Sequence, residues 1–224
     1  GLLWRMEGVE IPNPNHFSNV GTSGGGISIL SAQTLTNSDF MTGAFPAEYG
    51  NANSGVFDLK LRKGNNQKTE RTIQAGFLGT DLAIEGPFKK GYNGSYLINY
   101  RYSTLSMLGA LGVPVGDAIT NFQDISYNVF LPTEKAGNFS LFGFGGLSNQ
   151  NFDAKKDSSA WKNNYDRYSW NFRSNTGAAG LTHFLQLDSK TYLRSVFLVA
   201  GTGKGYEEER LNDEYAAVSQ GELV

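Results

Sequence analysis

The loop from Pro12 to Gly26 carries the side chains best suited to hold a ligand. Asn13 and Asn15 each offer an amide donor and an amide acceptor. His16 offers a ring nitrogen that can donate or accept, and Phe17 offers a ring that can stack on a sugar or an apolar surface. We therefore predict that this loop contributes to ligand binding, with a solvated connector as the alternative.

No set of residues predicts catalysis. The run Gly21-Thr22-Ser23-Gly24-Gly25 matches a nucleophile elbow, but that motif requires a strand before the serine and a helix after it. Here a Pro- and Asn-rich loop precedes the run, and a short apolar segment follows it. We interpret the run as a glycine loop and expect no enzyme.

Residues that bind metals are too scattered to predict a metal site or a cofactor. His16 and His183 are the only histidines, and the chain has no cysteine. His183 lies within an alternating segment, where a packing or lumen-facing role is expected. Asp153, Asp157 and Asp166 share one long loop with several lysines, so we interpret that loop as solvated rather than as a calcium site.

The composition favours a β-rich protein with many turns. Glycine accounts for 28 of the 224 residues, and the chain has 15 Phe and 11 Tyr but only 18% charged residues. A net charge of −2 gives no global attraction for nucleic acid. No apolar run is long enough for a membrane-spanning helix, but transmembrane strands alternate lipid-facing and lumen-facing residues and leave little such signal.

The pattern of residues divides the chain into two parts and a linker. Residues 1–63 predict a small α+β unit, with a short helix after Ser31, a short strand at Asp39–Thr42 and an alternating strand at Val56–Arg62. Residues 64–70 are polar and predict a linker. Residues 71–224 alternate with period two and predict about six antiparallel strands in three hairpins.

The connections between these strands are unequal. We predict short hairpin turns at Pro87–Gly94, Glu134–Asn138 and Asp188–Lys190, and long loops near residues 104–122 and 148–168. Short turns at one end and long loops at the other are typical of outer-membrane barrels.

The ends of the strand region carry three further expectations. A single strand is expected from Ile73 to Gly86, and no strand is expected after Glu214. Aromatic residues near the strand ends suit the interfacial girdles of a barrel: Phe88, Tyr92, Tyr100, Tyr102, Tyr168 and Trp170.

The segments between Glu7 and Gly64 resemble the second half of the plug of a TonB-dependent receptor. The resemblance begins with Glu7-Gly8-Val9-Glu10-Ile11 before a Gly-rich loop. It continues with Ile29–Leu35, then Ser38–Gly50, which ends in Phe-Pro-Ala-Glu-Tyr-Gly, and finally Ser54–Arg62. This variant resembles receptors from Bacteroidetes that carry a carboxypeptidase-regulatory-like domain, and the residues after the linker match only as barrel strands.

The resemblance implies a fold and a function. The expected fold is mainly β: the C-terminal half of a small α+β plug at 1–63, a linker at 64–70, and the first about six up-and-down strands of a larger transmembrane β-barrel at 71–224. The implied function is energised uptake of a glycan, a peptide or a metal chelate across the bacterial outer membrane. The chain would be a fragment of that transporter.

The resemblance also implies partners. These are outer-membrane lipid, the remainder of the same barrel, TonB through a region absent from this chain, and a surface lipoprotein lid. Nucleic acid is not among them. The loop from Pro12 to Gly26 would lie at the ligand-contacting apex of the plug.

The plug motif assigns structural roles to a few residues. Glu48, Tyr49 and Gly50 would form a turn that closes the plug sheet. Gly50 and Gly55 would supply a positive φ or a close backbone approach. Arg62 and Lys60 would meet acidic residues on the barrel wall.

A soluble or surface β-sandwich binding or adhesin module, with no transport role, is the alternative. A sandwich requires apolar inner faces and polar outer faces. The strands instead place Ser126 and Asn128 on one face and Ile125, Tyr127 and Val129 on the other, which favours a wet lumen and a lipid-facing surface. On this basis we predict that arginine is tolerated at Asn128 and not at Val129.

Overall fold

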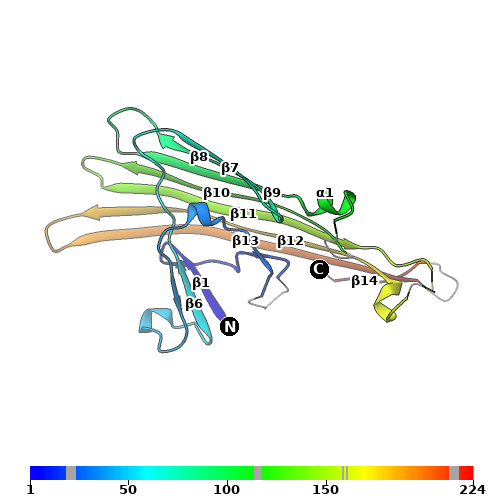
Figure 1. The fold of residues 1–224 in the computed structure, drawn as a ribbon. Coiled ribbons are helices and arrows are strands. Elements are labelled where there is room, and N and C mark those ends of the chain that lie inside the picture. Colours follow the sequence, from blue (N-terminus) through cyan, green and yellow to red (C-terminus); the bar gives the residue numbers. More distant parts are fainter. Residues whose placement is uncertain (19–23, 114–117, 158, 160, 212–216, 224) are drawn as a thin grey trace.

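The computed structural model describes residues 1–18, 24–113, 118–157, 159, 161–211 and 217–223. A small N-terminal unit (residues 1–63) lies against one face of a large antiparallel sheet (Figure 1). The mainly β fold predicted from the composition is therefore confirmed.

The N-terminal unit is built on a four-stranded sheet in the order β2-β1-β6-β5. β1 and β6 run parallel, with Leu3 opposite Val56. Both side chains are buried and pack together with Tyr49. The elements of the unit are β1 (Leu2–Met6), β2 (Val9–Glu10), β3 (Asn15–His16), β4 (Ile27–Ser28), the 3₁₀ turn η1 (Ala32–Thr34), β5 (Asp39–Met41), the 3₁₀ turn η2 (Ala47–Tyr49) and β6 (Gly55–Leu59).

All three elements predicted in this unit are present, and the strand predicted at Val56–Arg62 is β6, which ends at Leu59. Ser31 caps η1, because its hydroxyl accepts a hydrogen bond from the Gln33 backbone N–H at 3.3 Å, and the strand predicted at Asp39 is β5. Glu7 and Gly8 have φ values of 52° and 84°. Two successive positive φ values favour a tight hairpin, and these residues join β1 to β2.

The large sheet has eight strands, and each pairs with the next along the chain. The three predicted hairpin turns are confirmed, but the strands are longer than predicted and reach 20 residues in β13. The elements are β7 (Glu70–Ala75), β8 (Gly79–Pro87), β9 (Ser95–Ser103), α1 (Leu105–Ala110), β10 (Ile119–Pro132), β11 (Asn138–Phe152), the 3₁₀ turn η4 (Asn164–Arg167), β12 (Tyr168–Gln186), β13 (Tyr192–Leu211) and β14 (Ala217–Leu223).

Two strand predictions are wrong. The segment from Ile73 to Gly86 is a hairpin of β7 and β8, closed by a hydrogen bond of 2.9 Å from Gly76 N to the Gly79 carbonyl. The apolar pair between these glycines continued the apparent strand pattern through the turn, so periodicity alone did not separate the two strands. After residue 214 the chain forms β14, which pairs with the end of β13.

The large sheet has two chemically different faces. We call the face that contacts the N-terminal unit the inner face and the opposite one the outer face. The inner face carries small, polar and charged residues: Asp81, Glu85, Asn99, Arg101, Asp124, Ser126, Asn128, Ser148, Ser174 and Thr176, with Phe142, Phe144 and Ala178 among them. The outer face carries exposed apolar residues: Leu82, Ile98, Tyr100, Ile125, Leu141, Leu147, Leu181, Phe197 and Val199. This is the alternation that the sequence predicted for Ile125, Ser126, Tyr127, Asn128 and Val129 of β10.

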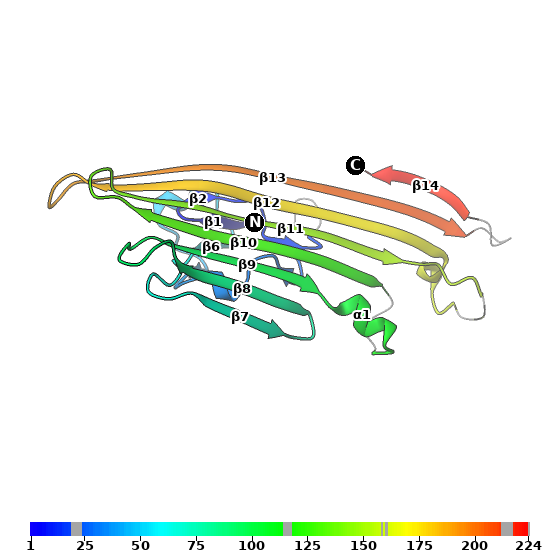
Figure 2. The same ribbon diagram turned by 90° about the horizontal axis from the view of Figure 1, so that it is seen from above.

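The two ends of the sheet also differ. The turns after β8, β10 and β12 lie together at one end, and α1 and η4 lie at the other end (Figures 1 and 2). Viewed from above, the strands lie side by side with the N-terminal unit beneath them (Figure 2). The long loops are shorter than predicted, because β10 already begins at Ile119 and β11 continues to Phe152.

Candidate functional site

The contact between the N-terminal unit and the inner face has an apolar centre. Met6, Ile29 and Leu59 of the unit form one buried cluster with Phe142 and Phe144 of β11. Burying a side chain of this size contributes about 1.5–3 kcal/mol. The unit is therefore held against the sheet by a small shared core.

Gly146 permits the close approach at this core. A Cβ atom added to Gly146 would lie 2.7 Å from Ile29 Cγ1 and 2.8 Å from His16 Cε1, whereas one added to Gly145 would lie 3.8 Å from Ile125. The two neighbours point to opposite faces. We expect Gly146→Ala to destabilise the folded chain by about 1–3 kcal/mol through overpacking, as measured by urea denaturation. Gly145→Ala is the matched control, and an equal loss in both variants would contradict the seating of the unit on this face.

A bidentate ion pair ties the end of the N-terminal unit to β8. Arg62 Nη1 and Nη2 donate to the two carboxylate oxygens of Glu85, each at 2.7 Å. Glu85 also accepts from the Asn65 backbone N–H at 2.7 Å, and Asn128 donates to the Arg62 carbonyl at 3.0 Å. The predicted pairing of Arg62 with an acidic residue of the following strands is confirmed. The same prediction is wrong for Lys60.

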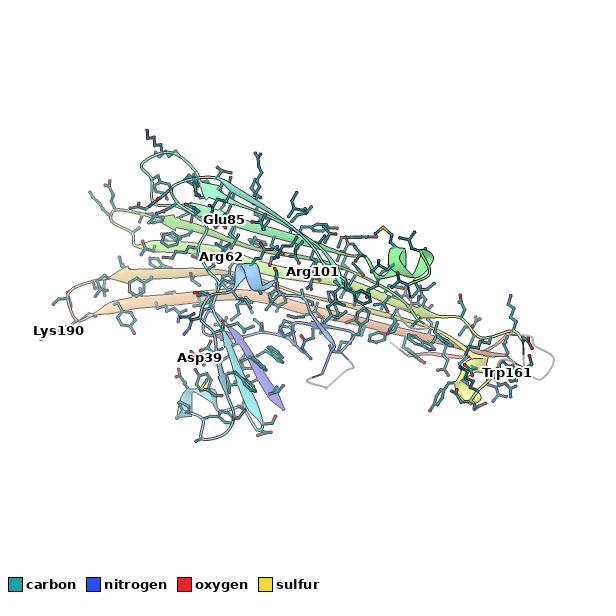
Figure 3. The ribbon with its side chains drawn as sticks, in the orientation of Figure 1. Asp39, Arg62, Glu85, Arg101, Trp161 and Lys190 are labelled. Atoms are coloured by element: carbon teal, nitrogen blue, oxygen red, sulfur yellow. The ribbon has the colours of Figure 1, made fainter. Side chains whose placement is uncertain are left out.

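Lys60 pairs within its own unit. Its ammonium lies 3.3 Å from Asp39, and both side chains are largely exposed. The acid that Lys60 meets therefore belongs to β5 of the unit and not to the large sheet. Figure 3 shows Arg62, Glu85 and Arg101 where the unit meets the sheet, and Asp39 on the far part of the unit.

A second charged cluster joins the unit to β9 and β10. Arg101 and Asp124 are cross-strand neighbours, and Asp124 Oδ2 accepts from Arg101 Nε at 2.8 Å and from Nη2 at 2.5 Å. Asp124 Oδ1 contacts His16 Nε2 of β3, and Arg101 also contacts the Ser28 carbonyl of β4. The side chains of Asp124 and His16 are 2% and 0% exposed. Both strands of the β3–β4 hairpin therefore attach to one buried ion pair.

His16 faces Asp124 through Nε2. This nitrogen must carry a hydrogen in order to donate to the carboxylate. Among the described residues, Nδ1 is buried without a hydrogen-bond partner. The ring also lies 4.9 Å from the Phe122 ring, centre to centre. His16 thus works as an anchor of the unit on the sheet.

Smaller polar contacts surround these two clusters. Asp81 accepts from Ser31 of the unit at 3.2 Å and from Asn99 at 2.9 Å. Toward the other edge, Arg194 donates to the Glu7 carbonyl at 2.8 Å, and Lys204 Nζ contacts Ser18. The unit is therefore held by side chains from β8 to β13, and most of these contacts are polar.

The four residues predicted to bind ligand are not presented together. His16 is buried beneath the unit, so it is neither a ligand contact at the surface nor a solvated loop residue. Asn15 donates to Asn13 at 2.8 Å, and Asn13 donates to the Gly24 carbonyl at 2.8 Å. Phe17, the next residue after His16, has a positive φ of 56°, in the left-handed region. The two amides therefore make hydrogen bonds within their own loop.

Ser23 of the run that resembles a nucleophile elbow lies outside the described residues.

The turn predicted at Glu48, Tyr49 and Gly50 is the 3₁₀ turn η2, which Gly50 follows. Tyr49 is the residue of this turn that packs against the unit. The Tyr49 hydroxyl donates to Asp58 of β6 at 3.1 Å, and the Arg5 guanidinium lies 4.7 Å from the centre of its ring. Burial, followed by the hydrogen bond to Asp58, raises the pKa of Tyr49. Glu48 is exposed.

The two glycines of the predicted motif have different roles. Gly50 has a φ of −58°, in the right-handed region, and the nearest atom to an added Cβ would be 4.0 Å away. The prediction for Gly50 is therefore wrong, because neither its conformation nor its surroundings require glycine. For Gly55 the predicted close approach is confirmed, since a Cβ would lie 2.7 Å from Leu2 Cδ2.

Predictions about two side chains on the large sheet, His183 and Trp170, can be compared with the structure. His183 packs on Phe139 with ring centres 4.5 Å apart, and its Nε2 lies 2.6 Å from the Ala136 carbonyl oxygen, which agrees with the expected packing role. Trp170 was expected in an outer girdle but lies on the inner face, where it stacks near Phe152.

Asp166 was predicted to be solvated and is instead buried. Lys155 Nζ lies 2.7 Å from its carboxylate, and the Lys162 and Asn163 backbone N–H groups donate to it at 2.6 and 3.1 Å. The hydrogen bond from Lys155, followed by that from Lys162, lowers the pKa of Asp166 to about 2. Asp166 therefore organises the loop between β11 and β12.

The lowered pKa makes the order of this loop depend on pH. The ordinary aspartate value is 3.8 and the folded value is about 2, so the stabilisation is complete above 3.8 and is lost as the pH falls toward 2. We expect the hydrogen-exchange protection of the Lys162 and Asn163 amides to fall over that range. In Asp166→Asn the protection should already be low at pH 6, and unchanged protection in this variant would contradict the assigned role.

No helix among the described residues is long and apolar enough to cross a membrane.

Comparisons with known proteins identified no relative of this chain. No protein-family model, no curated protein and no solved structure matches this chain.

Proposed function

We propose that this chain is part of a TonB-dependent outer-membrane transporter, with residues 1–63 as the C-terminal half of the plug and the large sheet as part of the barrel wall. The observation that supports this proposal best is the opposite chemistry of the two faces of the sheet. The plug-like unit covers the polar face, while the outer face exposes large apolar side chains such as Phe197 and Val199, which are 73% and 68% exposed. Extended apolar patches of this kind mark membrane or partner surfaces.

The dimensions of the outer face suit a bilayer. Along β12, its outward positions run from Leu185 through Leu181, Ala179 and Gly177 to Asn175, interrupted by His183. At about 3.4 Å per residue this stretch is roughly 34 Å long, and a tilt of about 40° reduces its height to about 26 Å. Outer-membrane barrels have an apolar band of about 25 Å. The remaining length of β12 would then project beyond the bilayer.

The contact between the unit and the sheet suits a plug that moves. The strands of each part pair within that part, so separation would break no ladder of the large sheet. The Arg101–Asp124 pair lies within the sheet and would remain intact, whereas the Arg62–Glu85 pair would separate and both charges would be hydrated in a water-filled lumen. A force applied through TonB, in a region outside this chain, could thus displace the unit and open a path for the ligand.

The other parts of the proposal follow the resemblance. The ligand class stays open between a glycan, a peptide and a metal chelate, because the fold does not choose among them. Partners would be outer-membrane lipid, the rest of the barrel, TonB and a surface lipoprotein lid, in the bacterial outer membrane. The sandwich alternative is less well supported, since it requires a polar outer face.

Single cysteines at the two ends of the sheet test this proposal. Lys135 lies in the turn after β10, and Lys156 lies in the loop after β11; both are exposed, and the chain has no cysteine of its own. In the full-length receptor on intact cells, we expect Lys156→Cys to react with an impermeant maleimide and Lys135→Cys to react only after permeabilisation. Equal labelling of both positions on intact cells would overturn the proposed orientation.

A further inference from the structure

Aromatic side chains gather on the inner face, at the end of the sheet that carries the long loops. Three successive inner positions of β12 are aromatic: Tyr168, Trp170 and Phe172. Phe152 of β11 lies opposite Trp170, and Tyr206 of β13 lies opposite Phe172. The centre of the Trp170 six-membered region lies near both neighbours: its ring is 6.1 Å from Phe152 and 6.4 Å from Tyr206, with planes only 13° and 26° apart. We call these five residues the aromatic track.

The track runs from the loop between β11 and β12 toward the N-terminal unit. At the loop end, the Tyr168 ring lies 6.5 Å from the ring of Tyr165, which is 80% exposed. At the other end, Lys204 Nζ donates to the Ser18 hydroxyl of the unit at 3.1 Å. From Tyr168 to Phe172 the strand covers roughly 14 Å, at about 3.4 Å per residue. The track is therefore long enough to contact more than one ring of a ligand.

Packing within the chain and contact with lipid do not explain the track. Each of its rings is partly exposed, and neither of the two buried apolar clusters of the described residues includes any of them. The inner face is also the polar face, which under the proposed function turns to the lumen and not to the bilayer. Partly exposed rings that face a lumen are suited to stack on a ligand.

The polar groups beside the rings have both signs of charge. The Tyr206 hydroxyl donates to the Glu208 carboxylate at 2.5 Å. Lys204 and Arg210 are cations at inner positions of β13 on either side of these two residues. Gln150 of β11, opposite Phe172 in the neighbouring strand, adds an amide. These surroundings favour a ligand that has many hydrogen-bonding groups and no large net charge.

We propose that the aromatic track binds a linear, neutral glycan. This inference rests on the proposed function, because it names the ligand class that the transporter would take up. A sugar ring presents C–H groups on its faces and hydroxyl groups at its rim, so it can stack on an aromatic ring and bond to carboxylate and amide groups at the same time. The inner positions of β12 repeat about every 7 Å, so successive sugar rings would each meet an aromatic ring.

The other two ligand classes fit the track less well. A peptide requires partners for its backbone N–H and C=O groups. β12 is paired with β11 on one side and with β13 on the other, so its backbone offers no such partners. A charged metal chelate would meet charges of both signs on β13, and the track would not select it.

Titration of the full-length receptor with oligosaccharides tests the track. The receptor is purified in detergent and titrated calorimetrically with maltohexaose, cellohexaose, xylohexaose and laminarihexaose. We expect at least one hexasaccharide to bind, and its disaccharide to bind at least about tenfold more weakly because it covers fewer rings. Trp170→Ala should weaken the hexasaccharide about tenfold, whereas Trp170→Phe, which keeps a ring, should retain most of the affinity. Phe197→Ala removes a ring from the outer face and is the matched control, with no expected change.

Several outcomes would overturn the glycan track. These are the absence of binding by all four hexasaccharides, equal affinity for the hexasaccharide and its disaccharide, and unchanged affinity in Trp170→Ala. Ferric citrate and a tryptic digest of casein are titrated in parallel, and binding of either that Trp170→Ala abolishes would also overturn the assignment to glycans. Cysteine labelling keeps the two proposals apart: a receptor with the proposed orientation that binds no hexasaccharide contradicts only this inference, and one that binds a hexasaccharide without inserting into the membrane contradicts only the proposed function.

Discussion

Asp124→Ala is expected to lower the free energy of unfolding by about 3–5 kcal/mol, the cost of breaking a buried ion pair by removing one partner. The carboxylate accepts two hydrogen bonds from Arg101 and contacts His16. Without it, a largely buried guanidinium and a buried imidazole lose their acceptor. Urea denaturation of the folded chain, followed by tryptophan fluorescence, measures the loss.

Asp39→Ala is the matched control for this prediction. It removes a carboxylate from the Lys60 pair, whose side chains are 49% and 64% exposed, and exposed pairs contribute no more than about 1 kcal/mol. A double variant, Arg101→Met with Asp124→Leu, should recover part of the loss, because apolar residues can replace a buried ion pair. Similar losses for Asp124→Ala and Asp39→Ala would contradict the buried anchor.

Val129→Arg is expected to impair membrane assembly. Arginine on the lipid face at the midplane of a barrel makes the free energy of the folded, inserted state less favourable by about 2–4 kcal/mol. Val129 lies in one cross-strand row of the outer face with Leu141, Leu181 and Phe197. Leu181 is in the middle of the apolar stretch of β12, so this row marks the expected midplane. The fraction of folded, membrane-inserted full-length protein measures the effect.

The control for Val129→Arg must lie on the same face. Arginine at Asn128 was predicted to be harmless, but Asn128 is buried and its amide donates to the Arg62 carbonyl, so that prediction is wrong. Asn121→Arg is the better control, because Asn121 is on the same strand and the same face, eight residues further out, where arginine costs about 0–1 kcal/mol. Equal impairment by the two outer-face variants would contradict the depth assigned to them.

Local pattern was sufficient for much of the fold. Alternation separated the two faces of β10, since side chains on a strand point to opposite sides at successive residues. Turn residues located the three hairpins, and Ser31 marked the start of η1. The same local signals failed at residues 76–79, where apolar residues lie within a turn, and at β14, which depends on pairing with β13.

The residues of the contact surface show where local pattern was insufficient. Arg62 was recognised as a cation that should meet an acid, but Glu85 was not identified as that acid, because the two are 23 residues apart and become neighbours only when the unit lies on the sheet. His16 was read as a loop residue because a Pro- and Asn-rich segment surrounds it. Its burial depends on Asp124, 108 residues away, and no local feature of either segment encodes that contact.

The sequence by itself determined that this chain is mainly β, that its strands have one polar and one apolar face, and that its connections alternate between short and long. These properties follow from side-chain alternation and turn chemistry, which act over a few residues. The tertiary structure alone decided which face the N-terminal unit covers, which charges pair there, and which aromatic rings lie together on the inner face. Those features depend on strand register and on packing between distant segments, and neither is fixed by neighbours in the sequence.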